Sequence, residues 1–294
     1  MKVKLLHHSE EWLPGDFDAP EALRGQASLA CWHIHALGAS DRIAMKLERG
    51  AGVWDTSGRL LHYSKTASDM TWDAGSRTLL SLECTFGKCS ASPGVRHALR
   101  RLDPESFQVV SEIDLCVRRG GVRYLVLDRS GRRCLATWLD ENEWGYVVVD
   151  LESMRQTDMS FHSTSASLSP PGFAPNGDSI VACNFFRTSW WNDEHDDPAE
   201  IRSPGGLRKL STISVQDVQS GTVSTHDLMV DLPAGWLPDR PHEGEWSTVW
   251  GPEFVSDRAF KIWLPDDSTE VIELPLPPTV VIPRTLADVR PWSD

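Results

Sequence analysis

The sequence predicts an all-β protein from two observations: strand-like residue patterns along most of the chain and a turn phrase that recurs. In this phrase an apolar strand end is followed by an acidic turn and then by a second apolar strand. The copies lie at residues 53–61, 102–110, 149–154, 215–223 and, more loosely, 264–271. Their marker acids are residues 55, 103, 150, 217 and 266, so the steps are 48, 47, 67 and 49 residues. A repeat near this length indicates one structural unit used several times.

The strands of one unit are clearest in the middle of the chain. Residues 124–127, 134–139 and 144–149 are rich in β-branched and aromatic side chains and are separated by polar turns, and a fourth strand is expected near residues 156–161. Four strands of the preceding unit are expected at residues 70–75, 78–86, 95–102 and 107–115. Four antiparallel strands within about 45 residues match one blade of a β-propeller, so we predict a single propeller domain.

A second turn motif precedes each inner hairpin. It is rich in Gly, Asn and Asp, which accept the positive φ that tight hairpin turns require. The copies lie at residues 72–76, 127–131 and 173–178, with a degenerate copy at 254–258. No amphipathic helical pattern exceeds two turns, and Pro20 to Gly25 is expected to form a single helical turn.

The two turn motifs together resemble the WD40-like β-propeller repeat family, in a degenerate form. That family carries Trp-Asp before the outer turn and Gly in the inner turn. Val53, Trp54 and Asp55, with Gly58, make the best copy, and the resemblance covers roughly residues 25–275. The Gly-His dipeptide of the strict family is missing. The resemblance implies a propeller fold and a protein-interaction function.

Five blades are predicted along the chain, at approximately residues 25–65, 66–117, 118–163, 164–231 and 232–278. The termini, residues 1–24 and 279–294, contain strand-like segments that we expect to complete one shared blade and close the ring. The ring then has five blades or, with a composite blade, six. A pair of β-sandwiches is the alternative fold, but it does not explain steps of 48, 47 and 49 residues.

The composition restricts location and partners. The chain carries 29 Lys and Arg against 42 Asp and Glu, and this net charge of −13 opposes nucleic-acid binding. Its six cysteines form no Cys-x-x-Cys pair, which indicates reduced thiols in a cytoplasmic protein. The first apolar stretch is too short for a secretory signal, and no apolar run is long enough to span a bilayer. We therefore expect a cytoplasmic protein that binds neither nucleic acid nor membrane.

The 67-residue step is longer than its neighbours by about 19 residues, and we place the insertion at residues 184–206. Insertions within repeats map to loops, often on the face that binds a partner. Adjacent indoles beside carboxylates can hold a cation, an amine or a partner's Arg or Lys. A divalent metal is an alternative, as is a structural role in which the indoles fold back over a blade. The candidate binding residues are Trp190, Trp191, Asp193, Glu194, His195 and Asp197.

The chain contains thirteen tryptophans. Those in strands are expected to pack between blades, and they are Trp54, Trp72, Trp138 and Trp263. Three more lie in or beside a Pro- and Gly-rich segment, where we predict an aromatic rim shared with the insertion: Trp236, Trp246 and Trp250.

His33 and His35 lie two residues apart, so a strand would place both imidazoles on one face. Such a pair can bind a metal if a third ligand joins it, whereas the favoured alternative is a hydrogen-bonded structural pair. The sequence contains no Gly-x-Ser-x-Gly, no Gly-x-x-x-x-Gly-Lys and no His-Glu-x-x-His motif.

These observations predict a non-catalytic module that binds a protein or peptide with basic or cationic groups through the acidic and aromatic loop face. No cofactor is expected, with a divalent metal as the alternative. The competing hypothesis is a hydrolase, lactonase or isomerase with a central-channel site built from His33, His35 or acids of several blades. A protein that binds a small molecule through its tryptophans is the third.

Overall fold

The computed structural model describes residues 2–5, 17–24, 28–37, 41–47, 49–84, 96–117, 121–139, 143–163, 170–185, 206–232, 250–264 and 269–283. These residues form strands and turns, and the one helix among them is the single 3-10 turn η1 (Glu21–Leu23), which follows Pro20 as expected. The all-β prediction is confirmed. No helix of the described ranges has the length and apolar character to cross a membrane.

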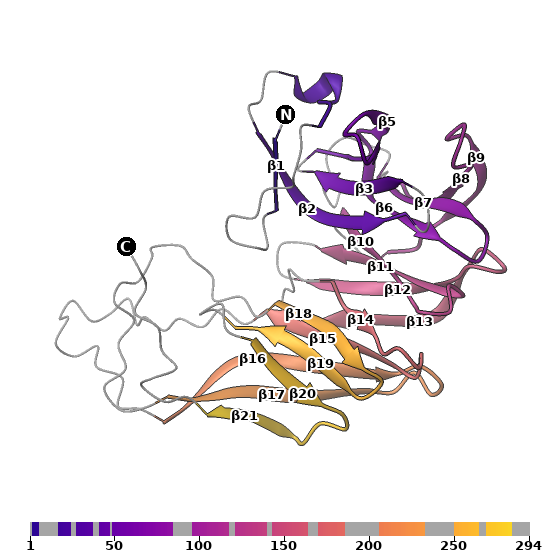
Figure 1. The fold of residues 1–294 in the computed structure, drawn as a ribbon. Coiled ribbons are helices and arrows are strands. Elements are labelled where there is room, and N and C mark those ends of the chain that lie inside the picture. The colour runs from indigo at the N-terminus through magenta and orange to yellow at the C-terminus, as the bar shows by residue number, and fades with distance from the viewer. Residues whose placement is uncertain are drawn as a thin grey trace. The chain divides into compact units, whose positions relative to one another are not determined.

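The chain divides into two compact units, residues 1–162 and 163–294. The first unit holds three sheets, drawn from indigo to magenta in Figure 1. Its first sheet has five strands in chain order, β1 (Lys2–Leu5), β2 (Ser28–Ala36), β3 (Arg42–Leu47), β4 (Ala51–Asp55) and β5 (Leu60–Ser64). β1 pairs with β2 in parallel, and the other pairings are antiparallel.

The second and third sheets have four strands each, in chain order. The second sheet contains β6 (Ala67–Asp73), β7 (Thr78–Cys84), β8 (His97–Leu102) and β9 (Val109–Asp114). The third contains β10 (Gly121–Leu127), β11 (Arg133–Leu139), β12 (Trp144–Asp150) and β13 (Arg155–Ser163). All eight strands lie where the residue pattern predicts them.

The second unit holds two sheets. The fourth sheet has the order β14 (Gly172–Phe173), β15 (Ser179–Phe185), β16 (Gly206–Asp217), β17 (Val223–Leu232) and β21 (Thr279–Pro283). The fifth contains β18 (Trp250–Ser256), β19 (Ala259–Trp263) and β20 (Thr269–Glu273).

The terminal strands β1 and β21 lie in different sheets, so the expectation that they complete one shared blade is wrong. β1 pairs with β2 in the first sheet, and β21 pairs with β17 in the fourth, both in parallel. A short strand satisfies its backbone groups at any open sheet edge, and each of these strands covers an edge of a sheet that already has four strands.

Apolar side chains of neighbouring sheets pack together in each unit. Leu82 and Leu99 of the second sheet share a cluster with Leu125 and Val149 of the third. In the second unit, Phe260 of the fifth sheet packs in one cluster with residues of the fourth. Each fully buried Leu or Phe contributes roughly 1.5–3 kcal/mol relative to an exposed one, so these inter-sheet layers stabilise each unit.

The predicted core tryptophans differ in burial. Trp54 is fully buried, and its Nε1 donates a hydrogen bond of 3.0 Å to the carbonyl of Asp18. Trp138 is 3% exposed and stacks on His162. Trp72 and Trp263 are only half-buried, which leaves part of each indole accessible.

The acid of the repeated phrase stabilises the turn that follows it. Asp103 Oδ1 accepts hydrogen bonds from the backbone N–H of Ser106 at 2.7 Å and from its hydroxyl at 2.8 Å. Asp55, Asp150 and Asp217 accept equivalent bonds from Ser57, Ser153 and Ser220. Because these bonds favour the ionised carboxylate, they lower the pKa of all four aspartates. Asp266, the fifth marker, lies outside the described residues.

Candidate functional site

Most of the residues predicted to bind a partner fall outside the described residues. They are Trp190, Trp191, Asp193, Glu194, His195, Asp197, Trp236 and Trp246. Trp250 is the first residue of β18. The predicted insertion, residues 184–206, runs from the end of β15 to the first residue of β16, the second and third strands of the fourth sheet. The binding role of this segment therefore stays a prediction.

His33 and His35 both lie on β2, and the side chain of His35 can be placed. Its Nε2 lies 3.5 Å from Oδ2 of Asp69, at hydrogen-bonding distance. Among the side chains that the structure describes, no group of three or more His, Cys, Asp or Glu is arranged to hold a metal ion. A metal site at His33 and His35 stays a prediction.

Asp69 is a buried carboxylate that the sequence did not single out. Its side chain is fully buried on β6. Oδ1 accepts the N–H of Met70 at 2.9 Å, and Oδ2 accepts the N–H of Leu125 on β10, also at 2.9 Å. Since His35 belongs to the first sheet and Leu125 to the third, this single carboxylate links all three sheets of the first unit.

Two further polar side chains are buried near this carboxylate. Lys46 donates a hydrogen bond to the carbonyl of Arg123, and its Nζ lies 4.2 Å from the centre of the Tyr124 ring. Burial, together with the charge of Asp69, raises the pKa of Tyr124 to about 12. The neutral phenol of Tyr124, the Lys46 ammonium and the Asp69 carboxylate together form a buried polar layer between the sheets.

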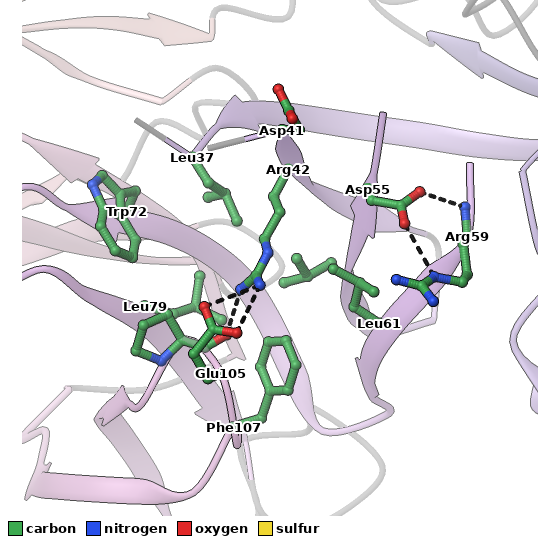
Figure 2. A pocket seen from close by; sticks show the side chains of 12 residues that line it. Leu37, Asp41, Arg42, Asp55, Arg59, Leu61, Trp72, Leu79, Glu105 and Phe107 are labelled. Carbon is green, nitrogen blue, oxygen red and sulfur yellow. Dashed lines mark hydrogen bonds and ion pairs between the residues drawn. The ribbon is translucent and has the colours of Figure 1, made fainter. Parts of the chain in front are cut away.

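A pocket of about 370 Å³ lies between the first and second sheets, at the end where their outer turns meet (Figure 2). Its apolar lining is formed by Leu37, Val53, Leu61, Trp72, Leu79 and Phe107. Its polar residues are Asp41, Arg42, Asp55, Arg59 and Glu105, with Pro104 beside them. Ligand sites likewise combine apolar side chains with polar groups that fix the orientation of the ligand.

Arg42 and Glu105 form an ion pair in the middle of this pocket, as Figure 2 shows. Arg42 Nη2 donates to both carboxylate oxygens of Glu105, at 3.0 and 3.1 Å, and Nη1 donates to the carbonyl of Pro104 at 2.6 Å. The Arg42 side chain is 24% exposed, whereas that of Glu105 is 77% exposed. The arginine thus belongs to the wall of the pocket and the glutamate to the solvent.

Phe107 forms another wall, from an unfavourable backbone conformation. Its φ is +56°, in the left-handed region that costs most side chains about 1 kcal/mol. At the corresponding position of other outer turns, Gly58 and Gly221 adopt positive φ without this cost. The Phe107 ring stacks on His62, with centroids 4.6 Å apart. Burial lowers the pKa of His62, so the stacked imidazole is neutral near neutral pH.

The residue pattern alone does not locate this pocket, although the sequence contains one signal for it. When the repeat copies are aligned on their acids, Phe107 follows Asp103 by four residues, as Gly221 follows Asp217. The shorter first copy completes its turn with Gly58, three residues after Asp55. A bulky residue at a turn position that favours glycine indicates that its ring makes compensating contacts. Arg42 offered no comparable signal, because its partner lies 63 residues away.

Comparison with known proteins finds similarity in structure only. No protein-family model matches the chain, and no curated protein matches it. The Kuenenia stuttgartiensis hydrazine synthase is similar with a TM-score of 0.55 and 10% identity, over 82% of this chain and 64% of that chain. The Dos1 propeller is similar with a TM-score of 0.52 and 12% identity, over 84% of this chain and 56% of that chain. The WD40 β-propeller domain of Doa1 has a TM-score of 0.45 and 13% identity, over 83% of this chain and 62% of that chain.

The chain spans less than two thirds of the length of each of these structures. At such low sequence identity the similarity shows the fold alone. The Dos1 propeller is the similar structure that indicates a propeller fold. The four-stranded sheets and this likeness agree with the repeat. The chain is similar in fold to a β-propeller, as its repeat predicts.

Proposed function

We propose that the chain is a non-catalytic interaction module that binds a protein or peptide partner with basic or cationic groups. The observation that carries the proposal is the pocket between the first two sheets, which combines an apolar lining with charged groups held by turns. Contacts of this kind, an apolar anchor surrounded by polar groups, dominate the energetics of protein interfaces.

Charge supports a basic partner. The polar residues of the pocket include three acids, Asp41, Asp55 and Glu105, against the two bases Arg42 and Arg59. The whole chain carries a net charge of −13. Such a surface accelerates association with cationic groups and disfavours anionic macromolecules. The acids and indoles at residues 190–197, as the sequence predicts, favour the same class of partner.

The proposal includes the finer organisation of the fold. The five sheets are taken as successive blades of one propeller, with boundaries near residues 65, 117, 163 and 231. A cytoplasmic location belongs to the proposal as well, because the six cysteines of the sequence include no Cys-x-x-Cys pair, a pattern that favours reduced thiols. No cofactor is required for binding of this kind.

A peptide selection tests the proposal. The whole chain is immobilised and a random displayed peptide library is selected on it, and selected peptides are then measured by titration calorimetry. We expect enrichment of peptides that contain Lys or Arg, with affinity that falls as salt rises. Trp72→Ala should weaken binding if the pocket contacts the peptide. The double variant Trp190→Ala and Trp191→Ala should weaken binding if the insertion contacts it. Failure to enrich any peptide over an unrelated acidic protein would contradict the proposal.

The enzymatic alternative has one observation in its favour. His35 on β2 and Asp69 on β6 bring an imidazole and a buried carboxylate together from neighbouring sheets, and such pairs serve in acid–base catalysis. Elemental analysis of the purified protein tests the metal-dependent form of this alternative, because it requires a stoichiometric divalent metal.

A further inference from the structure

The ion pair in the pocket joins a fixed arginine to a removable carboxylate. Arg42 is held by the Pro104 carbonyl at 2.6 Å and is 24% exposed, so it stays in the pocket wall when Glu105 leaves. Glu105 is 77% exposed. An ion pair with so exposed a partner stabilises the fold little, because water solvates the carboxylate almost as well. A competing carboxylate can therefore replace Glu105 at small cost.

The next pair of sheets shows that this arrangement is particular to the pocket. Arg101 also donates to a carbonyl of the neighbouring sheet's outer turn, that of Leu151, which occupies the turn position of Pro104. Its charge, however, is matched by Asp73, a carboxylate only 1% exposed at 3.1 Å. Glu152, the counterpart of Glu105 in that turn, is exposed to solvent. Arg101 thus has a buried counter-ion, whereas Arg42 relies on a surface one.

The surroundings of Arg42 define what could replace Glu105. Leu37 and Trp72 lie on one side of the guanidinium, and Leu61 and Phe107 lie toward the other (Figure 2). A half-buried guanidinium among apolar side chains is complementary to a carboxylate attached to an apolar group. A volume of about 370 Å³ is at the small end for ligand sites, which fits one large side chain better than a long segment.

We propose that the pocket binds the C-terminal residue of a partner peptide, with its terminal carboxylate replacing Glu105 on Arg42 and its apolar side chain against Trp72 and Phe107. In a C-terminal residue the carboxylate and the side chain leave the same Cα, so both fit one small pocket. This inference rests on the proposed function and narrows it. Basic residues that precede the C-terminus would face Asp41, which is exposed, whereas Asp55 is 21% exposed and already paired with Arg59 at 3.1 Å.

Titration calorimetry with three probes tests the inference. The first is a peptide with two lysines upstream of a free C-terminal phenylalanine, the second is the same peptide amidated, and the third is 3-phenylpropionate. The variants are Arg42→Gln and Glu105→Gln. Their matched controls are Arg133→Gln and Glu152→Gln. Arg133 lies opposite Asp150 in its strand ladder, as Arg42 lies opposite Asp55, and Glu152 has the turn position of Glu105.

Glu105→Gln removes the competing carboxylate, and we expect it to tighten binding of the free peptide by about two- to fivefold. Arg42→Gln and amidation should each weaken binding by about tenfold or more, because each removes a charge-assisted hydrogen bond. In Arg42→Gln the free and amidated peptides should bind equally. Both control variants should remain within about twofold of the unaltered chain. Circular dichroism confirms that each variant is folded.

Equal binding of the free and amidated peptides to the unaltered chain would overturn the inference. So would a Glu105→Gln affinity equal to that of Glu152→Gln, and this exposed substitution does not endanger folding. Binding of 3-phenylpropionate alone would replace the peptide with a small carboxylic acid as the ligand. If library-selected peptides bind regardless of Arg42 and Glu105, the inference fails while the proposed function stands; if no peptide binds at all, the proposed function fails.

Discussion

Replacing Asp69 with alanine should destabilise the first unit strongly, because its carboxylate links three sheets. The side chain is fully buried. It accepts the N–H of Leu125 at 2.9 Å from the third sheet and the N–H of Met70 at 2.9 Å within its own. His35 Nε2 of the first sheet lies 3.5 Å away. The substitution removes the acceptor for all three at once.

The magnitude follows from the donors that lose this acceptor. Each buried donor without a partner costs about 1–3 kcal/mol. Met70 and Leu125 are both almost fully buried, so Asp69→Ala should lower the free energy of unfolding by about 3–5 kcal/mol. Asp69→Asn keeps one acceptor oxygen and fills the same volume. Its NH2 group, however, then faces one of the two backbone N–H donors, that of Met70 or that of Leu125. We expect a smaller loss of about 1–3 kcal/mol for asparagine.

Urea unfolding followed by circular dichroism measures these differences through the midpoint and slope. Asp158→Asn is the control, because Asp158 is exposed on β13 and should change stability by less than about 0.5 kcal/mol. The expected order of destabilisation is Asp69→Ala, then Asp69→Asn, then Asp158→Asn. A cost for Asp69→Ala equal to that of the control would refute the argument that this carboxylate links the sheets.

Three further predictions concern turns and thiols. Phe107→Gly should be about 1 kcal/mol more stable than Phe107→Ala, since both lose the ring but only alanine keeps the strain of a positive φ; equal urea midpoints would contradict this. The four turn aspartates have lowered pKa values when folded, so their contribution is complete above about pH 4 and is lost as the pH falls through the lowered values. The urea midpoint should therefore fall on acidification, and less steeply in Asp103→Asn; an unchanged slope in that variant is the contrary result. Cys116 is exposed and should react with a thiol reagent in the native protein, whereas buried Cys183, whose pKa burial raises to about 12, should react only after unfolding; mass spectrometry of the labelled native protein distinguishes the two.

Local interactions explain why much of the fold can be predicted from the sequence. The strands β10, β11 and β12 follow from residue alternation, which depends on neighbours along one chain segment. The acidic turns are equally local, since the bonds of Asp103 and Asp217 span only two or three residues. Such features can be identified wherever donor and acceptor lie within one turn.

The site depends instead on contacts between sheets. Asp69 and Leu125 are 56 residues apart, and Arg42 and Glu105 are 63 apart. Alternation shows that a strand has two faces, but it does not show which turn of the next sheet a given side chain meets. The sheets that β1 and β21 join cannot be predicted for the same reason, because an open edge accepts any strand with free backbone groups.

Differences between copies of the repeat recover part of this missing information. Phe107 and Met154 both adopt positive φ where Gly58 and Gly221 do so freely, so each requires contacts that offset the backbone cost. Met154 obtains them by packing against the core cluster of the second and third sheets. Phe107 packs against the cluster of the first and second sheets, and its ring also stacks on His62 and lines the pocket. Glycine at position 107 would complete the turn at lower backbone cost, so the contacts of this ring are what distinguish the turn, and they place the candidate ligand site here rather than at its three counterparts.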